Sequence, residues 1–172
     1  MLKKSFIYSS IFLVLQMVTF TSIQGEVLNS VSTSFKEDSL KVSTLLDSCW
    51  GKRTSSPSEA LALGVKALKL IEEKDITSLK TKTLNYLGVV HRKLGNLEKS
   101  YEYFKYALNL AKVLKDSVQI GYTYNNLSDY YLKKASYSIA LENVLMAYQI
   151  FEKLNHQIGM AYSLNYMGEI YI

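Results

Sequence analysis

The chain has 172 residues, 48% of them hydrophobic and 20% charged, a balance that is typical of a folded domain and argues against an intrinsically disordered chain. With one proline and eight glycines, the composition gives little support to a turn-rich β-sandwich or barrel. Its many Ala, Leu, Lys, Glu and Tyr residues favour helices. The net charge of +5 is not gathered into a run of Lys or Arg, so we expect no nucleic-acid partner.

The N-terminal segment 1–25 has the pattern of a secretory signal peptide. Lys3 and Lys4 precede an apolar stretch at 6–20, and a short polar exit ends in Gly25. We therefore expect an exported protein, located in the periplasm or at the cell surface of a bacterium. The apolar stretch is short for a membrane-spanning helix, so the alternative is an uncleaved leader that anchors the protein in the inner membrane.

The strongest pattern in the chain is an internal repeat with a period of forty residues. Asparagine recurs at one position of the period and alanine at another, and each asparagine is followed two residues later by an apolar side chain. The recurring residues are Asn85, Asn125 and Asn165, and Ala67, Ala107 and Ala147. Recurrence in register predicts an array of equivalent structural units.

Each unit is predicted to contain two helices. Apolar residues recur at a spacing of three to four from Leu84 to Leu94 and again from Leu97 to Leu108, which is the period of a helix with one buried face. Gly95-Asn96 separates the two stretches and suits a short turn. A polar stretch at 133–136 has the same place in the next unit.

One helix start can be predicted in detail. Pro57 is suited to the first position of a helix, where its missing N–H costs nothing. Ser56 is then expected to cap the free amides, and Glu59 to complete a capping box.

The period also sets the domain boundaries. Units are expected at about 40–79, 80–119 and 120–159, followed by a partial unit at 160–172. Residues 26–39, rich in Ser and Thr, are expected to form a loose lead-in to this repeat domain.

Small residues at fixed places mark the points where helices cross. Gly88, Ser100 and Ala107 are such places, because a larger side chain would force the helix axes apart. A single helix pair cannot bury its apolar face, so the stacking of successive pairs supplies the core. We therefore expect an all-α solenoid of antiparallel helix pairs.

Two consecutive units share an ordered set of apolar and small residues. The shared positions are Leu84, Leu87, Gly88, His91, Ser100, Phe104 and Ala107, and then Tyr124, Leu127, Ser128, Tyr131, Ala140, Val144 and Ala147. In this order they resemble the tetratricopeptide repeat, and the long period resembles the subclass found in kinesin light chains and bacterial regulatory proteins. The resemblance implies a right-handed superhelix of about three and a third repeats. The first unit departs from the pattern at Thr44, Asp47, Ser48 and Gly51, so we expect a divergent cap there.

The resemblance also implies a concave groove that is lined by the first helix of each unit and holds an extended peptide or a partner helix. The groove residues would be Lys82, Asn85, Val89, Arg92, Tyr122, Asn125, Asp129, Tyr162, Asn165 and Glu169. A carboxamide both donates and accepts, so a row of asparagines can pair with a peptide backbone. Equally, the asparagines can bind neighbouring helices and hold the stack in register. Lys82 and Arg92 can receive a carboxylate or remain solvated.

The last residues have the pattern of the first helix of a fourth unit. Its apolar side chains would be partly bare, and burying such a side chain is worth about 1.5–3 kcal/mol. The residues concerned are Met160, Leu164, Met167, Ile170 and Tyr171. We therefore expect an N-terminal fragment of a larger protein, with self-association through this helix as the alternative. Membrane contact is expected only through an uncleaved leader or a segment further downstream.

No catalytic, cofactor or metal site is expected. His91 and His156 fall at different places in the period and have no companion at metal-ligand spacing. Gly51-Lys52 lacks the upstream glycine of a phosphate-binding loop. Cys49 has no intrachain partner for a disulfide, and beside Trp50 it is expected to be a half-buried thiol.

These patterns leave two hypotheses for function. The first is an exported protein–protein interaction module, not an enzyme, that binds a peptide or partner helix in its groove. The second is the sensory input region of a larger bacterial signalling protein, such as a sensor histidine kinase or a transcriptional regulator.

Overall fold

The computed structural model describes residues 24, 28–30 and 32–172. The chain divides into two compact units, 1–40 and 41–172. The predicted signal peptide lies outside the described residues except for Gln24.

The described part of the lead-in is helical, at 28–30 and 32–39, so the expectation of a loose segment is wrong there. Ser and Thr lower helix propensity because their hydroxyls compete for backbone groups, but in a helix they can bond to the carbonyl one turn earlier. Thr33 Oγ1 donates in this way to the carbonyl oxygen of Asn29 at 2.8 Å.

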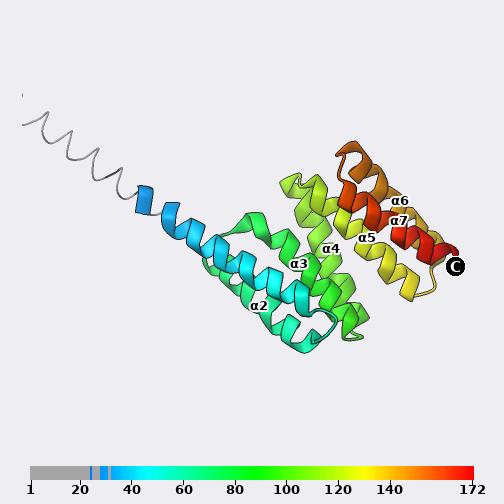
Figure 1. Cartoon of the computed structure of the whole chain (residues 1–172), viewed down its shortest axis with the longest axis horizontal. Coiled ribbons are helices and arrows are strands. Elements are labelled where there is room, and N and C mark those ends of the chain that lie inside the picture. The colour runs from blue at the N-terminus through cyan, green and yellow to red at the C-terminus, as the bar shows by residue number, and fades with distance from the viewer. Residues whose placement is uncertain (1–23, 25–27, 31) are drawn as a thin grey trace, which may run out of the picture. The chain divides into compact units, whose positions relative to one another are not determined.

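The 41–172 unit consists of helices joined by short turns (Figure 1). Residues 41–52 form the first helix of this unit. The helices that follow are α2 (Pro57–Glu73), α3 (Thr77–Lys93), α4 (Leu97–Leu114), α5 (Ser117–Lys133), α6 (Tyr137–Lys153) and α7 (Gln157–Tyr171). Helices α2, α4 and α6 start forty residues apart, and so do α3, α5 and α7. The described residues contain no strand, so the prediction of an all-α fold is confirmed.

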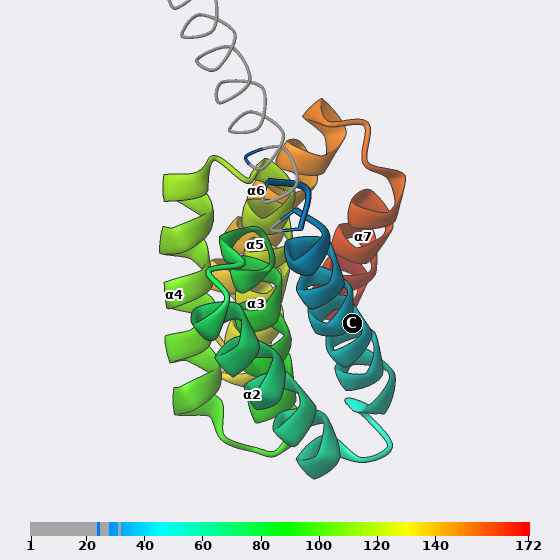
Figure 2. The same cartoon turned by 90° about the vertical axis from the view of Figure 1, so that its left-hand side faces the viewer.

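The helices stack in a row, as expected for a solenoid. Each helix from α2 to α7 packs on the next, and α5 also packs on both α3 and α7. Within this described part of the chain, α4 and α6 make no such contact. In the side view, α4 lies on the opposite side of the stack from α7, with α3 and α5 between them (Figure 2). Because the first helices touch one another and the second helices do not, the first helices form the inner side.

The turns between these helices share one conformation. Asp75, Gly95, Lys115, Ala135 and Asn155, spaced twenty residues apart, have φ between 50° and 79°. The turn predicted at Gly95 is confirmed. The same left-handed geometry at the four other positions costs roughly 1–2 kcal/mol for an ordinary L-residue, so helix packing on both sides must hold these turns in place.

The start of α2 differs from the prediction in its capping. The helix begins at Pro57, as expected, but the side chain of Ser56 makes no capping hydrogen bond. Glu59 does not complete a capping box, because its carboxylate receives Lys52 Nζ at 2.7 Å. Capping groups occur instead at Asp116, which accepts from Gln119 N at 3.0 Å, and at His156, where Nδ1 accepts from Gly159 N at 2.9 Å.

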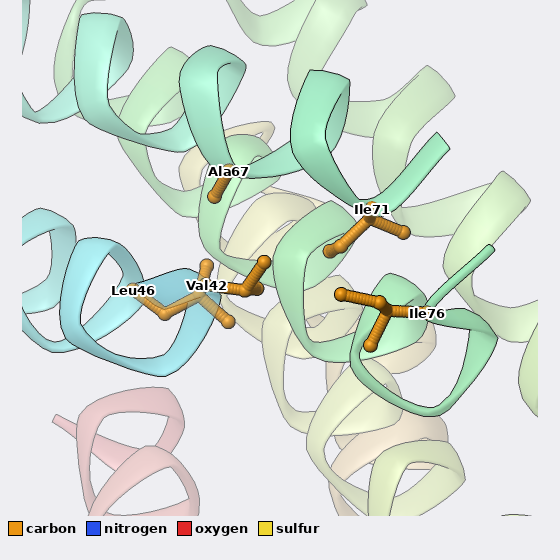
Figure 3. Close-up of a cluster of buried hydrophobic side chains, with 5 residues drawn as sticks. All are labelled: Val42, Leu46, Ala67, Ile71 and Ile76. Carbon is orange, nitrogen blue, oxygen red and sulfur yellow. The ribbon is translucent and has the colours of Figure 1, made fainter. Parts of the chain in front are cut away.

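The first helix pair of the unit closes one end of the core. The core cluster drawn in Figure 3 joins the 41–52 helix to α2 and to the turn that follows it. Its members are Val42, Leu46, Ala67, Ile71 and Ile76. Cys49 is completely buried, not half-buried, and its burial raises the pKa of the thiol to about 11.

Helix crossings occur where small residues were predicted. Ser100 and Ala107 are completely buried. A Cβ atom added to Gly88 would lie 2.4 Å from a ring carbon of Phe104. The Phe104 ring from α4 therefore packs directly on the backbone of α3 at this glycine. At the equivalent position of α7, a Cβ on Gly168 would meet nothing within 4 Å.

Helix α7 is the most exposed of the first helices. Leu164 and Tyr171 are largely exposed, and the other predicted apolar residues of this helix are not fully buried. A search of the described residues for helices of sufficient length and hydropathy to cross a membrane finds none.

Candidate protein-binding groove

A pocket of about 360 Å³ opens on the inner side of the stack. Aromatic rings and carboxamides make up most of its wall. The lining residues are Trp50, Tyr86, Tyr122, Tyr162 and Tyr166, the amides Asn85, Gln119, Asn125 and Asn126, and Lys82 and Ile158. Half of the groove residues predicted from the sequence therefore meet in one place: Lys82, Asn85, Tyr122, Asn125 and Tyr162.

The repeat register explains this meeting. Lys82, Tyr122 and Tyr162 are forty residues apart on α3, α5 and α7. Residues four positions later on a helix share its face, so Tyr86 and Tyr166 accompany them. The prediction missed these last two residues, although the i, i+4 rule identifies both. Trp50 had no comparable signal, because the first unit departs from the repeat pattern.

Stacked and edge-on rings shape the wall. The rings of Trp50 and Tyr86 stack with centroids 4.5 Å apart. Tyr122 meets Tyr162 edge to face at 6.4 Å and Phe151 at 5.0 Å. Since each ring is supported by another, the aromatic surface is preorganised for a flat apolar group.

Cationic groups lie against the aromatic wall of the pocket. Lys82 Nζ lies 5.4 Å from the centre of the Tyr86 ring, and the guanidinium of Arg53 covers the Trp50 ring at 3.9 Å. Among the described lining residues none is acidic. Burial and the nearby Asp47 raise the pKa of Tyr86 to about 12. Its phenol therefore stays neutral and can donate a hydrogen bond at physiological pH.

Asn85 is saturated by the neighbouring helix. Its Nδ2 donates to Gln119 Oε1 at 3.1 Å and to Thr123 Oγ1 at 2.9 Å, and its Oδ1 accepts from Asn126 Nδ2 at 3.3 Å. Thr123 itself donates to the carbonyl oxygen of Gln119. Asn85 thus holds α5 against α3. For this asparagine, the alternative in which it binds a neighbouring helix is the one that the structure shows.

Asn125 repeats only half of this arrangement. Ser163 Oγ donates to Asn125 Oδ1 at 3.0 Å, as a hydroxyl of the next first helix should. Asn125 Nδ2 is buried and has no hydrogen-bond partner within the described chain. The third asparagine, Asn165, is exposed and donates to Glu169 at 2.8 Å. Asn165 and Glu169 are not among the residues that line the pocket.

A change of residue size accounts for the free amide. Gln119 and Asn126, whose side chains form hydrogen bonds with Asn85, are replaced forty residues later by Gly159 and Tyr166. Gly159 is required there, because a Cβ atom would lie 2.3 Å from the ring of Phe151. The large ring of Phe151 therefore removes the amide that would otherwise reach Asn125.

The remaining predicted groove residues serve the scaffold. Arg92 Nη1 lies 2.6 Å from Asp129 Oδ2, and both side chains are over 90% buried. Arg92 therefore receives a carboxylate from its own chain and is not solvated. Val89 lies in the core with Phe104 and Leu127, so it is not available to a ligand.

The histidines form no metal site in the described part of the chain, where no group of three or more His, Cys, Asp or Glu could hold an ion. His91 stacks on Tyr103 with centroids 5.2 Å apart, and its burial, together with Lys99, lowers the pKa of the imidazole. His156 caps α7.

A family model matches the central part of the chain. Residues 80–153 match the family model of the tetratricopeptide repeat. This match covers α3 to α6, the two units whose residues follow the repeat pattern best. No curated protein matches the chain in sequence.

Proposed function

Since the chain belongs to the tetratricopeptide repeat family, whose repeats form protein–protein interaction modules, we propose that it binds an extended segment of a partner protein on the inner side of its stack. The observation that carries this proposal is the aromatic and amide-rich pocket between α3, α5 and α7. Rings with polar tips are the side chains most often used as anchors in protein interfaces.

The pocket is suited to binding more than to chemistry. Lys82 is the one charged lining residue in the described chain, and no carboxylate or imidazole lies beside it to act as a proton-transfer partner. Helical repeats of this family are typically not enzymes. In this proposal the chain acts by holding a partner, with no bound cofactor.

Export forms part of the proposal and is supported by the sequence alone. Lys3, Lys4 and the apolar stretch at 6–20 have the order of a secretory leader. The partner would then be a protein of the periplasm or cell surface, and an uncleaved leader would keep the complex at the inner membrane.

A second candidate makes the chain the sensory input of a larger signalling protein. The exposed side chains of Leu164 and Tyr171 on α7 favour it, because a further helical segment could cover them. Attaching such a segment should slow the exchange of α7 amide hydrogens. Unchanged exchange in α7 would count against this second candidate.

Site-specific photocrosslinking tests the first proposal. A photoreactive phenylalanine analogue in place of Tyr122 should capture members of a library of short synthetic peptides. The matched control is the same analogue in place of Tyr106, an exposed residue of α4 outside the groove. Capture at both positions to the same degree, or at neither, would contradict binding on the inner side.

A further inference from the structure

We propose that the pocket on the inner side selects a proline-rich segment in the polyproline II conformation, and that Asn125 Nδ2 donates to one of its backbone carbonyls. This inference rests on the proposed function and deepens it, because it names the class of peptide that the pocket accepts.

The aromatic wall provides the first reason. A polyproline II helix presents flat pyrrolidine rings at regular intervals and has no internal hydrogen bonds. Grooves lined by aromatic rings bind such segments and gain from their low conformational entropy. Tyr122 and Tyr162 offer their rings to such a segment. The stacked pair of Trp50 and Tyr86, with Arg53 over Trp50 and Lys82 near Tyr86, lines the same pocket.

The free amide of Asn125 provides the second reason. This side chain is 2% exposed, lines the pocket, and has a buried Nδ2 without a partner. A buried donor without an acceptor is unfavourable until a ligand supplies one. Proline has a carbonyl but no N–H, so a proline-rich backbone is rich in acceptors and poor in donors, which complements a pocket whose unpaired group is a donor.

The site is specific to one place in the stack. At the equivalent place one unit earlier, Asn85 Nδ2 donates to Gln119 Oε1 and to Thr123 Oγ1. At Asn125 the corresponding residues are Gly159, which has no side chain, and Ser163, which donates to Asn125 Oδ1 instead, so Nδ2 stays free. The ring of Phe151, which requires Gly159, thus leaves one donor of the repeat free, and this donor lines the pocket.

The charges narrow the class further. Lys82 lies at the pocket wall and Arg53 covers Trp50, with no acidic residue among the described lining. A neutral proline segment fits this field, and one flanked by acidic residues fits it better. Proline-rich segments flanked by Lys or Arg should bind more weakly.

The chain contains its own probe. Trp50 is the single tryptophan in the sequence, and it lines the pocket, so its fluorescence emission reports directly on occupancy. We would titrate the full chain with a blocked oligoproline peptide that contains no aromatic residue. The matched control is a peptide of equal length with alanine in place of proline. Oligoproline should give a saturable change in emission and bind at least about tenfold more tightly than the alanine peptide, because its rings pack on the aromatic wall and its backbone is already in the polyproline II conformation.

Variants of the repeating asparagine test the hydrogen bond. Asn125→Ala should weaken oligoproline binding about tenfold, and Asn125→Asp should weaken it more, because a carboxylate would replace the donor with an acceptor. Asn165→Ala changes the same repeat position outside the pocket and should bind as the original chain does. If changes at Asn125 impair folding, Tyr162→Ala on the exposed side of the pocket should also weaken binding, while Tyr106→Ala should not.

Each outcome has a definite meaning. Equal binding of the alanine and proline peptides would overturn the proline class but leave peptide binding on the inner side intact. Unchanged affinity in Asn125→Ala would overturn the assigned hydrogen bond. A Trp50 response to a neutral disaccharide, with none to either peptide, would overturn both this inference and the proposed function.

Discussion

At the scale of single residues, the three asparagines that recur every forty residues differ in role: one holds the helices together and another is available to a ligand. Asn85 is fully bonded to α5, Asn125 is half bonded to α7, and Asn165 is exposed. The sequence predicts that these asparagines have equivalent places in the stack, because they recur every forty residues. It does not predict which member is free, since that depends on the ring of Phe151 and on the glycine it requires at position 159.

The buried ion pair leads to a prediction about stability. Arg92→Met should destabilise the fold by about 3 kcal/mol, because Asp129 would remain buried with only the exposed Lys133, 4.0 Å away, as a countercharge. Replacing both residues together, by Met and Leu, should cost much less than the single change. The measurement is the free energy of unfolding in urea.

A matched control uses an ion pair on the surface. Lys52 and Glu59 are also in contact, at 2.7 Å, but both are about half exposed. Lys52→Ala should cost less than about 1 kcal/mol. Equal losses of unfolding free energy in Arg92→Met and Lys52→Ala would show that burial does not increase the contribution of the Arg92–Asp129 pair to stability.

His91 gives the fold a dependence on pH. Burial, followed by the charge of Lys99, lowers the pKa of His91 below its ordinary value of 6.5. The unfolded chain therefore binds a proton more readily than the folded chain does. The stability gained from the neutral imidazole is complete above about pH 6.5 and is lost as the pH falls toward the folded-state pKa.

The prediction compares two variants across this range. The free energy of unfolding of the original chain should fall more steeply from pH 7.5 to pH 5.5, about one unit either side of 6.5, than that of His91→Phe. Both proteins keep His156, so its contribution cancels. Identical slopes would mean that His91 is not protonated differently in the two states.

At the scale of elements, helix positions could be predicted closely and helix ends less well. The spacing of apolar residues gave the turn at Gly95, and Pro57 marked the start of α2. The predicted capping by Ser56 is wrong, and Glu59 is engaged instead by Lys52, which lies on the preceding helix and could not be placed from the local sequence. The helical lead-in was missed because the low helix propensity of Ser and Thr is only a weak guide, which context often overrides.

Two glycines at one repeat position test how α3 and α4 pack. Gly88→Ala should destabilise the protein by about 1–3 kcal/mol, because the new methyl group would overlap the ring of Phe104. Gly168→Ala should stabilise it by up to about 1 kcal/mol, since alanine is the better helix former and the added atom meets nothing within 4 Å. Thermal unfolding followed by circular dichroism measures both. A gain in Gly88→Ala would contradict the close crossing.

At the scale of the whole molecule, the repeat fixes the stack, and departures from the repeat create the pocket. The solenoid follows from recurrence in register, which is why it could be predicted without any tertiary contact. The pocket needs Trp50 from the atypical first unit and the free amide of Asn125. Neither feature is visible in the periodic pattern.

The central claim is that equivalent first helices contact one another in a fixed forty-residue register and so form the inner side. A double-mutant cycle on Asn85 and Thr123 tests it most directly, because these side chains bond across that register. Asn85→Ala and Thr123→Val should be non-additive in unfolding free energy by about 0.5–3 kcal/mol. The control pair, Asn85→Ala with Ser163→Ala, should be additive, because Ser163 bonds to Asn125 instead. Additive effects for both pairs would contradict the register, and with it the inner side on which the proposed binding depends.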